Sequence, residues 1–235
     1  PALAGTIYRN KIDRYYGDLD LLLKRQDVER AYHVLATIGY KPAVTVARPE
    51  WYAQHHFHIQ LKSPADLMLE LHWELTTPHD YIRFDLDGIR ERSVTCEFEG
   101  QAASIMCPQD ALLHLASQQL DLEDCFSDLR RTFDAALILQ KGLEDEAALA
   151  QRAQECGAGT ALWLYLDTVQ AIADVPAPGR LEAQLRPGRL RRYFIRSLDV
   201  PGNALGKLVT RHGGVADLVQ WWCAPSMSTA LRLVF

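Results

Sequence analysis

The stretch of sequence that decides the fold is "RYYGDLDLLLKR" at residues 14–25, where two aspartates interrupt a run of leucines. Successive side chains of a strand point to opposite faces, so a strand here places the leucines at 19, 21 and 23 on one face, which we expect to pack in the core. Asp18 and Asp20 then share the other face. Two neighbouring carboxylates repel each other unless a positive charge lies between them. The stretch therefore predicts a strand whose acidic face either lines a solvated edge or holds a cation.

A β-hairpin with a second polar face is predicted from two alternating runs, "HHFHIQLK" and "DLMLELHWEL". The connection "SPAD" between them is rich in turn-forming residues. A tight turn places Gln60 opposite Glu70 on the polar face. The same register places His58 opposite His72. The leucines of both runs and Trp73 occupy the other face, where we expect them to pack in the core.

The remaining pattern divides the chain into a mixed half and a helical half. A helix is expected over residues 27–38, and "VTCEFEGQAASIMC" predicts a strand pair that turns near Gly100. After Pro108 the apolar spacing is helical, with breaks at glycine and proline. The sequence therefore predicts an α+β chain with one domain at 1–107 and a helical domain at 108–235.

Composition narrows the classes of protein that this chain can belong to. The 235 residues carry a net charge of −5, which disfavours general affinity for nucleic acid. No apolar run is long enough to span a bilayer, the start does not resemble a signal peptide, and the five cysteines are scattered. We therefore expect a cytoplasmic protein with no membrane contact and no disulfide partner.

A basic segment stands apart from this acidic average. Residues 180–211 include eight basic and two acidic residues. Such a segment either forms a solvated helix face or binds phosphates or an acidic partner.

The acidic residues of the two predicted polar faces suit a metal site. Asp18, Asp20 and Glu70 would supply three carboxylates from two strands, and Mg²⁺ prefers oxygen ligands together with waters that a phosphate can replace. Two such ions can clamp the attacking and leaving oxygens of a phosphoryl or nucleotidyl transfer. His72 would either hydrogen-bond Glu70 or be a half-buried structural histidine.

The same residues resemble the nucleotidyltransferase superfamily that includes DNA polymerase beta, and in particular its group of uncharacterised nucleotidyltransferases. The resemblance rests on Gly5-Thr6, on "RYYGDLDLLL", on Gly39-Tyr40 at the end of the next helix, and on "LELHWEL". Thr6 stands where serine is usual in the superfamily. "DLRRTFDAALIL" is similar to a helical segment of the group and carries Asp134, which could instead form a helix salt bridge with a neighbouring arginine, Arg130 or Arg131.

The resemblance covers residues 5–140 and implies a polymerase-beta-like mixed sheet with helices, followed by a helical C-terminal region. It implies a nucleoside triphosphate substrate such as ATP, whose phosphates lie near Gly5, Thr6, Arg14 and Gly17. It further implies that Mg²⁺ or Mn²⁺ is held by the catalytic carboxylates Asp18, Asp20 and Glu70. The acceptor is left open among small molecules, proteins and tRNA, and pyrophosphate is the expected leaving group.

Two other functions remain open from the residues alone. His56, His58 and His72 with a carboxylate would suit zinc or iron, which predicts a metal-dependent hydrolase. A nucleotidyltransferase fold without turnover would instead be a binding module. Retention of zinc separates the first alternative from the magnesium hypothesis, and triphosphate binding without pyrophosphate release identifies the second.

Overall fold

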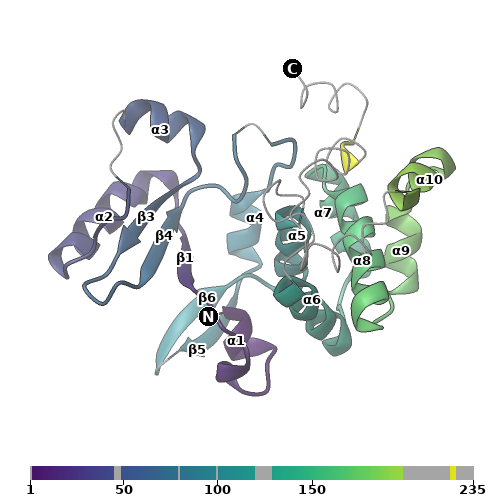
Figure 1. Cartoon of the computed structure of the whole chain (residues 1–235), viewed down its shortest axis with the longest axis horizontal. Coiled ribbons are helices and arrows are strands. Elements are labelled where there is room, and N and C mark those ends of the chain that lie inside the picture. The colour runs from purple at the N-terminus through teal and green to yellow at the C-terminus, as the bar shows by residue number, and fades with distance from the viewer. Residues whose placement is uncertain are drawn as a thin grey trace.

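A four-stranded mixed sheet lies at one end of the molecule and a group of helices at the other (Figure 1). The strand order is β1-β4-β3-β2, with β1 parallel to β4 and β3 antiparallel to both of its neighbours. These features are taken from a computed structural model, which describes residues 2–44, 49–78, 80–98, 100–119, 129–197 and 223–225. The bounds of the sheet strands are β1 Asp18–Leu22, β2 Lys41–Pro42, β3 His58–Lys62 and β4 Met68–His72.

Short helices and a second hairpin complete the part of this half that the structure describes. The α-helices of this half are α1 (Ala2–Thr6), α2 (Val28–Thr37), α3 (Pro49–His55) and α4 (Leu86–Glu91). The 3₁₀ turns are η1 (Lys11–Asp13) and η2 (Arg25–Asp27), and the hairpin is β5 (Val94–Phe98) with β6 (Gln101–Ile105). The strand pair that turns near Gly100 is thus confirmed.

The helical half follows in the order that the sequence predicts. Its helices are α5 (Pro108–Gln118), α6 (Leu129–Lys141), α7 (Glu146–Glu155), α8 (Gly159–Ala173), α9 (Gly179–Leu185) and α10 (Arg189–Ser197). The α+β class, with a mixed sheet followed by helices, is therefore confirmed. The end of the basic segment and most of the predicted helical domain after residue 197 lie outside the described residues.

The apolar face of the sheet packs against α2. Its centre is formed by Leu61, Leu69 and Leu71, and partly buried side chains of β1 and α2 surround them. The predicted core positions at the two margins are wrong. Leu21 is 36% exposed because β1 stands at the end of the strand order, and Leu67 is 64% exposed because it precedes β4 in the turn.

The hairpin register agrees with the alternation in the sequence. His58 lies opposite His72 and Gln60 opposite Glu70. The turn of this hairpin also contacts the end of α2, where Gly39 has a φ of +92° and a Cβ would lie 2.9 Å from Cγ of Pro64. Glycine is required there because other residues rarely adopt this φ and because the proline ring occupies the space.

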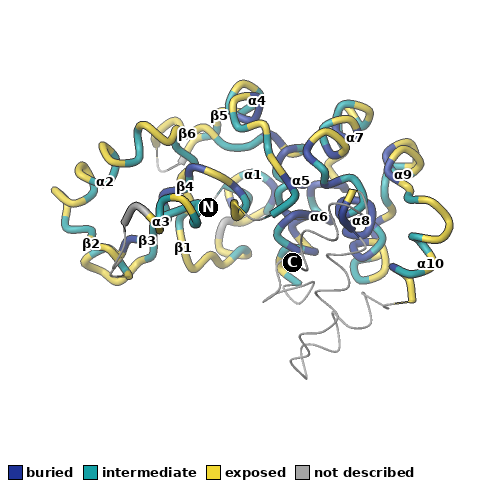
Figure 2. The backbone as a smooth tube through the Cα atoms, turned by 90° about the horizontal axis from the view of Figure 1, so that it is seen from above, coloured by how far each residue is buried: buried dark blue, intermediate teal, exposed yellow. Residues whose placement is uncertain are grey.

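The main hydrophobic core lies among helices α5–α9, where buried residues gather in Figure 2. α8 is central to it, since it packs against α5, α6, α7 and α9 and buries Trp163 and Tyr165. Ile7 and Ile82 from the first half also join this core. The division into domains at Pro108 stays a prediction.

Two further observations concern the environment of the chain. Among the residues described, no helix is both long and apolar enough to cross a membrane. In the described part of the chain, Cys96, Cys107 and Cys156 are free thiols.

Candidate active site

Two neighbouring parallel strands bring the acidic residues together. β1 and β4 pair so that Asp20 lies directly beside Glu70, and Asp18 lies two residues earlier on the same face of β1. These residues and His72 line a cleft of about 1290 Å³. Residues of α1, α4, α5, α6 and the β5–β6 hairpin line other parts of this cleft, and the polar face of the sheet forms its floor.

Hydrogen bonds fix the carboxylate of Glu70 on this floor. Nε2 of Gln60, its partner across the hairpin, donates to Oε1 of Glu70 at 2.7 Å. Nε2 of His72 lies 3.0 Å from the other oxygen, Oε2, and 3.2 Å from Oδ1 of Asp20. His72 therefore bridges the two carboxylates that the strand pairing brings side by side.

The carboxylates of Asp20 and Glu70 favour a positive charge on the His72 ring that lies between them. Burial lowers the pKa of His72, but its hydrogen bonds to Asp20 and Glu70 outweigh burial and raise that pKa to about 9. The hydrogen bond from His72 lowers the pKa of Glu70, and burial of Asp20 is likewise outweighed by His72, so that its pKa is lowered. Partial burial of Asp18, together with the charges of Asp20 and Glu70, raises its pKa.

The histidine cluster differs in one member from the sequence prediction. The ligand atoms of His58, Glu70 and His72 all lie within 4.8 Å of one another, and no other group of this kind occurs in the part of the chain that the structure describes. His56 is not a member, because it precedes β3 and its ring stacks on Tyr52 at a centroid distance of 3.9 Å. The expectation that His56 joins His58 and His72 is therefore wrong.

The predicted phosphate-binding residues differ in whether they line the cleft. Thr6 and Gly17 line the cleft, whereas Gly5 is exposed and is not among the described residues that line it. Gly5 and Thr6 end the short helix α1, and the Thr6 hydroxyl donates to the carbonyl of Ala2 at 2.8 Å. Their contact with a triphosphate stays a prediction.

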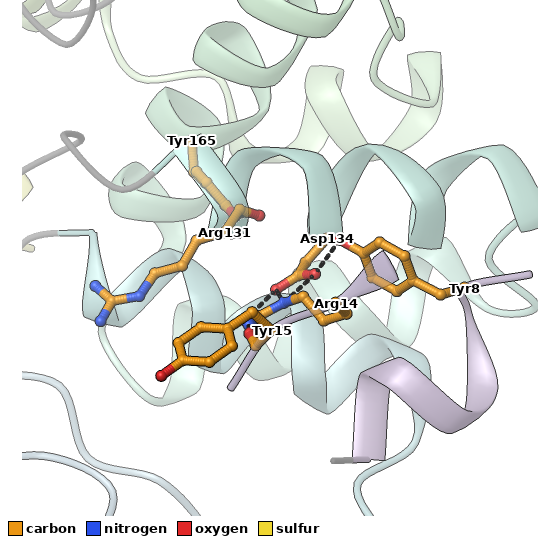
Figure 3. A network of polar contacts seen from close by, with 6 residues as sticks. All are labelled: Tyr8, Arg14, Tyr15, Arg131, Asp134 and Tyr165. Carbon is orange, nitrogen blue, oxygen red and sulfur yellow. Dashed lines mark hydrogen bonds and ion pairs between the residues drawn. The ribbon is translucent and has the colours of Figure 1, made fainter. Parts of the chain in front are cut away.

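Arg14 also lines the cleft, but its guanidinium is engaged by a buried carboxylate (Figure 3). Nε lies 2.9 and 3.0 Å from the two oxygens of Asp134, and Nη2 lies 2.8 Å from Oδ2. Tyr8 donates to Oδ1 of the same carboxylate at 2.7 Å, and Arg14 also donates to the carbonyl of Tyr15. The loop before β1 is thereby attached to α6, which positions Asp18 and Asp20 relative to the helices.

This network corrects the expected helix salt bridge of Asp134. Its partner is Arg14, 120 residues away in sequence, instead of Arg130 or Arg131. α6 turns Asp134 inward to a fully buried position, while the side chain of Arg131 extends away from it in Figure 3. The carbonyl of Arg131 accepts a hydrogen bond from Tyr165 on α8.

Sequence reasoning missed His114, which lines the cleft from α5. Burial lowers the pKa of His114 to about 4, so its imidazole is neutral near pH 7. The signal in the sequence is a single histidine between two leucines in "ALLHLA" at residues 111–116. Glu74, the alternative third carboxylate, follows the end of β4 and is not among the described residues that line the cleft.

The donor set of the floor fits a hard divalent cation by its chemistry. Asp18, Asp20 and Glu70 offer carboxylate oxygens, the ligands that Mg²⁺ and Mn²⁺ prefer. Asp20 and Glu70 also raise the pKa of His72, which is the direction expected for two carboxylates that favour a positive charge beside them. Asp18 and Asp20 are exposed, so their side chains have room to rotate toward a bound ion.

Comparisons with known proteins agree with this geometry. The family model described as "uncharacterised nucleotidyltransferase" matches residues 1–174, which include the sheet, the cleft floor and the Arg14–Asp134 pair. Neither the curated proteins nor the solved structures that were searched give a match. The match covers well over half of the chain, and the chain therefore belongs to the family of uncharacterised nucleotidyltransferases.

Proposed function

We propose that the chain transfers a nucleoside monophosphate from a nucleoside triphosphate to an acceptor. The observation that carries this proposal is the in-register pair of Asp20 and Glu70, with Asp18 on the same face, at the floor of a cleft of about 1290 Å³. A cleft of this size holds a nucleotide together with a small acceptor group. Membership of the nucleotidyltransferase family supports the same reaction class.

The proposed reaction is a displacement at the α-phosphorus. An oxygen of the acceptor forms a bond to this phosphorus, the bond to the bridging oxygen of the β-phosphate breaks, and pyrophosphate leaves. The acceptor's proton passes to solvent or to a carboxylate of the floor. Asp18, Asp20 and Glu70 would hold Mg²⁺ or Mn²⁺, which supplies charge stabilisation for the phosphate oxygens when bound. The chain's own contribution is to position the reactants and to provide the negative floor.

The acceptor is proposed only by class. Small-molecule hydroxyls, protein side chains and a tRNA end each offer a suitable oxygen. The basic residues of the described helix α10 include Arg192 and Arg196 and would favour an RNA acceptor, and binding through them would weaken steeply with salt.

The test is pyrophosphate release by the full chain with each nucleoside triphosphate, Mg²⁺ or Mn²⁺, and pools of the three acceptor classes. Asp18→Asn and Asp20→Asn should each lower the rate by at least about 100-fold, as expected when charged groups that act on the transition state are removed. Asp66→Asn is the matched control, because Asp66 is exposed on the hairpin turn and its φ of 63° suits asparagine.

The outcomes separate the candidate functions. Turnover that is unchanged in Asp18→Asn and Asp20→Asn would contradict the proposed mechanism. Triphosphate binding without pyrophosphate release from any acceptor pool would instead identify a binding module. Loss of the circular-dichroism spectrum in the variants would show that the aspartates are structural.

A further inference from the structure

We propose that His58, Glu70 and His72 form a binding site for a zinc-class divalent metal ion beside the aspartates of the cleft floor. The ligand atoms of these three residues lie within 4.8 Å of one another. The site lies on adjacent strands of one hairpin, so the backbone holds its members in place.

The distances suit tetrahedral coordination. Oε2 of Glu70 lies 3.0 Å from Nε2 of His72 and 3.9 Å from Nε2 of His58. In a tetrahedral zinc site with bonds of about 2.0–2.1 Å, neighbouring ligand atoms are about 3.3–3.4 Å apart. The two observed separations lie on either side of this value, and all the ligand atoms lie within 4.8 Å of one another, so the side chains must move closer together to close the site around an ion.

The orientation of Glu70 favours such a site. Gln60 holds Oε1 of Glu70 by a hydrogen bond of 2.7 Å, which turns Oε2 toward both imidazole rings. The two rings are stacked with centroids 5.0 Å apart and planes at 28°. In metal sites, residues that do not touch the ion typically orient a ligating carboxylate by such a hydrogen bond.

The donor types select the class of metal. Two imidazole nitrogens and one carboxylate suit zinc and the later divalent transition metals, whereas magnesium takes oxygen ligands. The side chains of the site are only 13–15% exposed, which limits access of water to the ion. Nε2 of His72 lies 3.2 Å from Oδ1 of Asp20, and it must lose its proton to solvent when it binds the ion.

The second nitrogens of the two rings predict an exchangeable metal. Nδ1 of His58 and Nδ1 of His72 are buried and have no hydrogen-bond partner within the described part of the chain. Such partners typically contribute about 10–100-fold to metal affinity. We therefore expect zinc to be released to a strong chelator such as EDTA, unlike the ion of a closed structural site.

Glu70 belongs to both this site and the carboxylate set of the proposed transfer reaction. One carboxylate oxygen that is bound to zinc is withdrawn from the set that would hold Mg²⁺. Because of this overlap, zinc should inhibit nucleotidyl transfer and excess Mn²⁺ should relieve the inhibition. This prediction rests on the proposed function.

The test measures metal binding directly on the full chain. Zn²⁺ affinity is determined by competition with a chromophoric chelator, and Co²⁺ binding by its visible absorption. His58→Ala should weaken Zn²⁺ binding by at least about 100-fold because it removes a ligand. His56→Ala is the matched control, since His56 stacks on Tyr52 outside the site, and it should change the affinity less than twofold. Equal affinity in His58→Ala and the wild type would overturn the proposal.

Two further measurements keep the result independent of folding and of catalysis. Zinc added to the unaltered chain should shift the imidazole NMR signals of His58 and His72 but leave those of His33 unchanged, and the reverse pattern would overturn the site. Asp18→Asn should retain zinc affinity while it loses transfer. If zinc binds as described but no variant or wild type transfers a nucleotide, only the proposed function fails.

Discussion

Replacement of Arg14 by methionine should destabilise the fold, because it leaves a buried carboxylate without its main partner. Asp134 has no exposed surface, and Arg14 supplies its ionic hydrogen bonds through Nε and Nη2. Removing one member of a buried ion pair typically costs about 3–5 kcal/mol. Arg14 is itself 18% exposed, so water can reach the vacated space, and we expect the lower end of that range.

The assay is thermal unfolding followed by circular dichroism. For a chain of this length, a loss of about 3 kcal/mol lowers Tm by roughly 6–12 °C. Arg186→Met is the matched control, because the ion pair of Arg186 with Glu182 is half exposed and such pairs contribute less than about 1 kcal/mol. Adding Asp134→Leu to Arg14→Met should recover part of the loss, because no buried charge then remains. A Tm of Arg14→Met equal to that of the control would refute the reasoning.

Three further predictions follow from single contacts. Tyr8→Phe removes the hydroxyl that donates to Asp134 at 2.7 Å and should lower the unfolding free energy by about 1.5–3 kcal/mol, measured by urea denaturation. Burial lowers the pKa of His114 from 6.5 to about 4, so its imidazole NMR signals should titrate near pH 4, and a titration midpoint near 6.5 would contradict this burial. The free energy of unfolding should therefore decrease as pH falls from 6.5 toward 4, and His114→Gln should reduce this decrease. Gly39→Ala should lower Tm, because alanine must adopt a φ of +92° and contact Pro64, and an unchanged melting curve would contradict the strain.

The local parts of the fold could be predicted from the sequence. Alternation of polar and apolar residues assigned the two faces of the hairpin, and the tight turn between the strands placed Gln60 opposite Glu70. Helical spacing likewise identified the helices that follow Pro108. Leu21 was misplaced because alternation assigns a face but does not show that β1 ends the strand order.

The non-local contacts could not be predicted. Parallel pairing of β1 with β4 joins residues about fifty positions apart, and it alone makes Asp20 a direct neighbour of Glu70. The pair of Arg14 and Asp134 spans 120 residues, and nothing in either segment specifies the other. The resemblance drew attention to both residues, yet their contact depends on the packing of α6 against the loop before β1.

The position of the label in the product tests the central claim most directly. The full chain is incubated with Mg²⁺ or Mn²⁺, an acceptor pool and a nucleoside triphosphate that carries radioactive phosphorus at either the α or the γ position. Nucleotidyl transfer predicts that the α label enters the acceptor, that the γ label leaves in pyrophosphate, and that Asp20→Asn abolishes both events. Transfer of the γ label to the acceptor, or α labelling that persists in Asp20→Asn, would contradict the account.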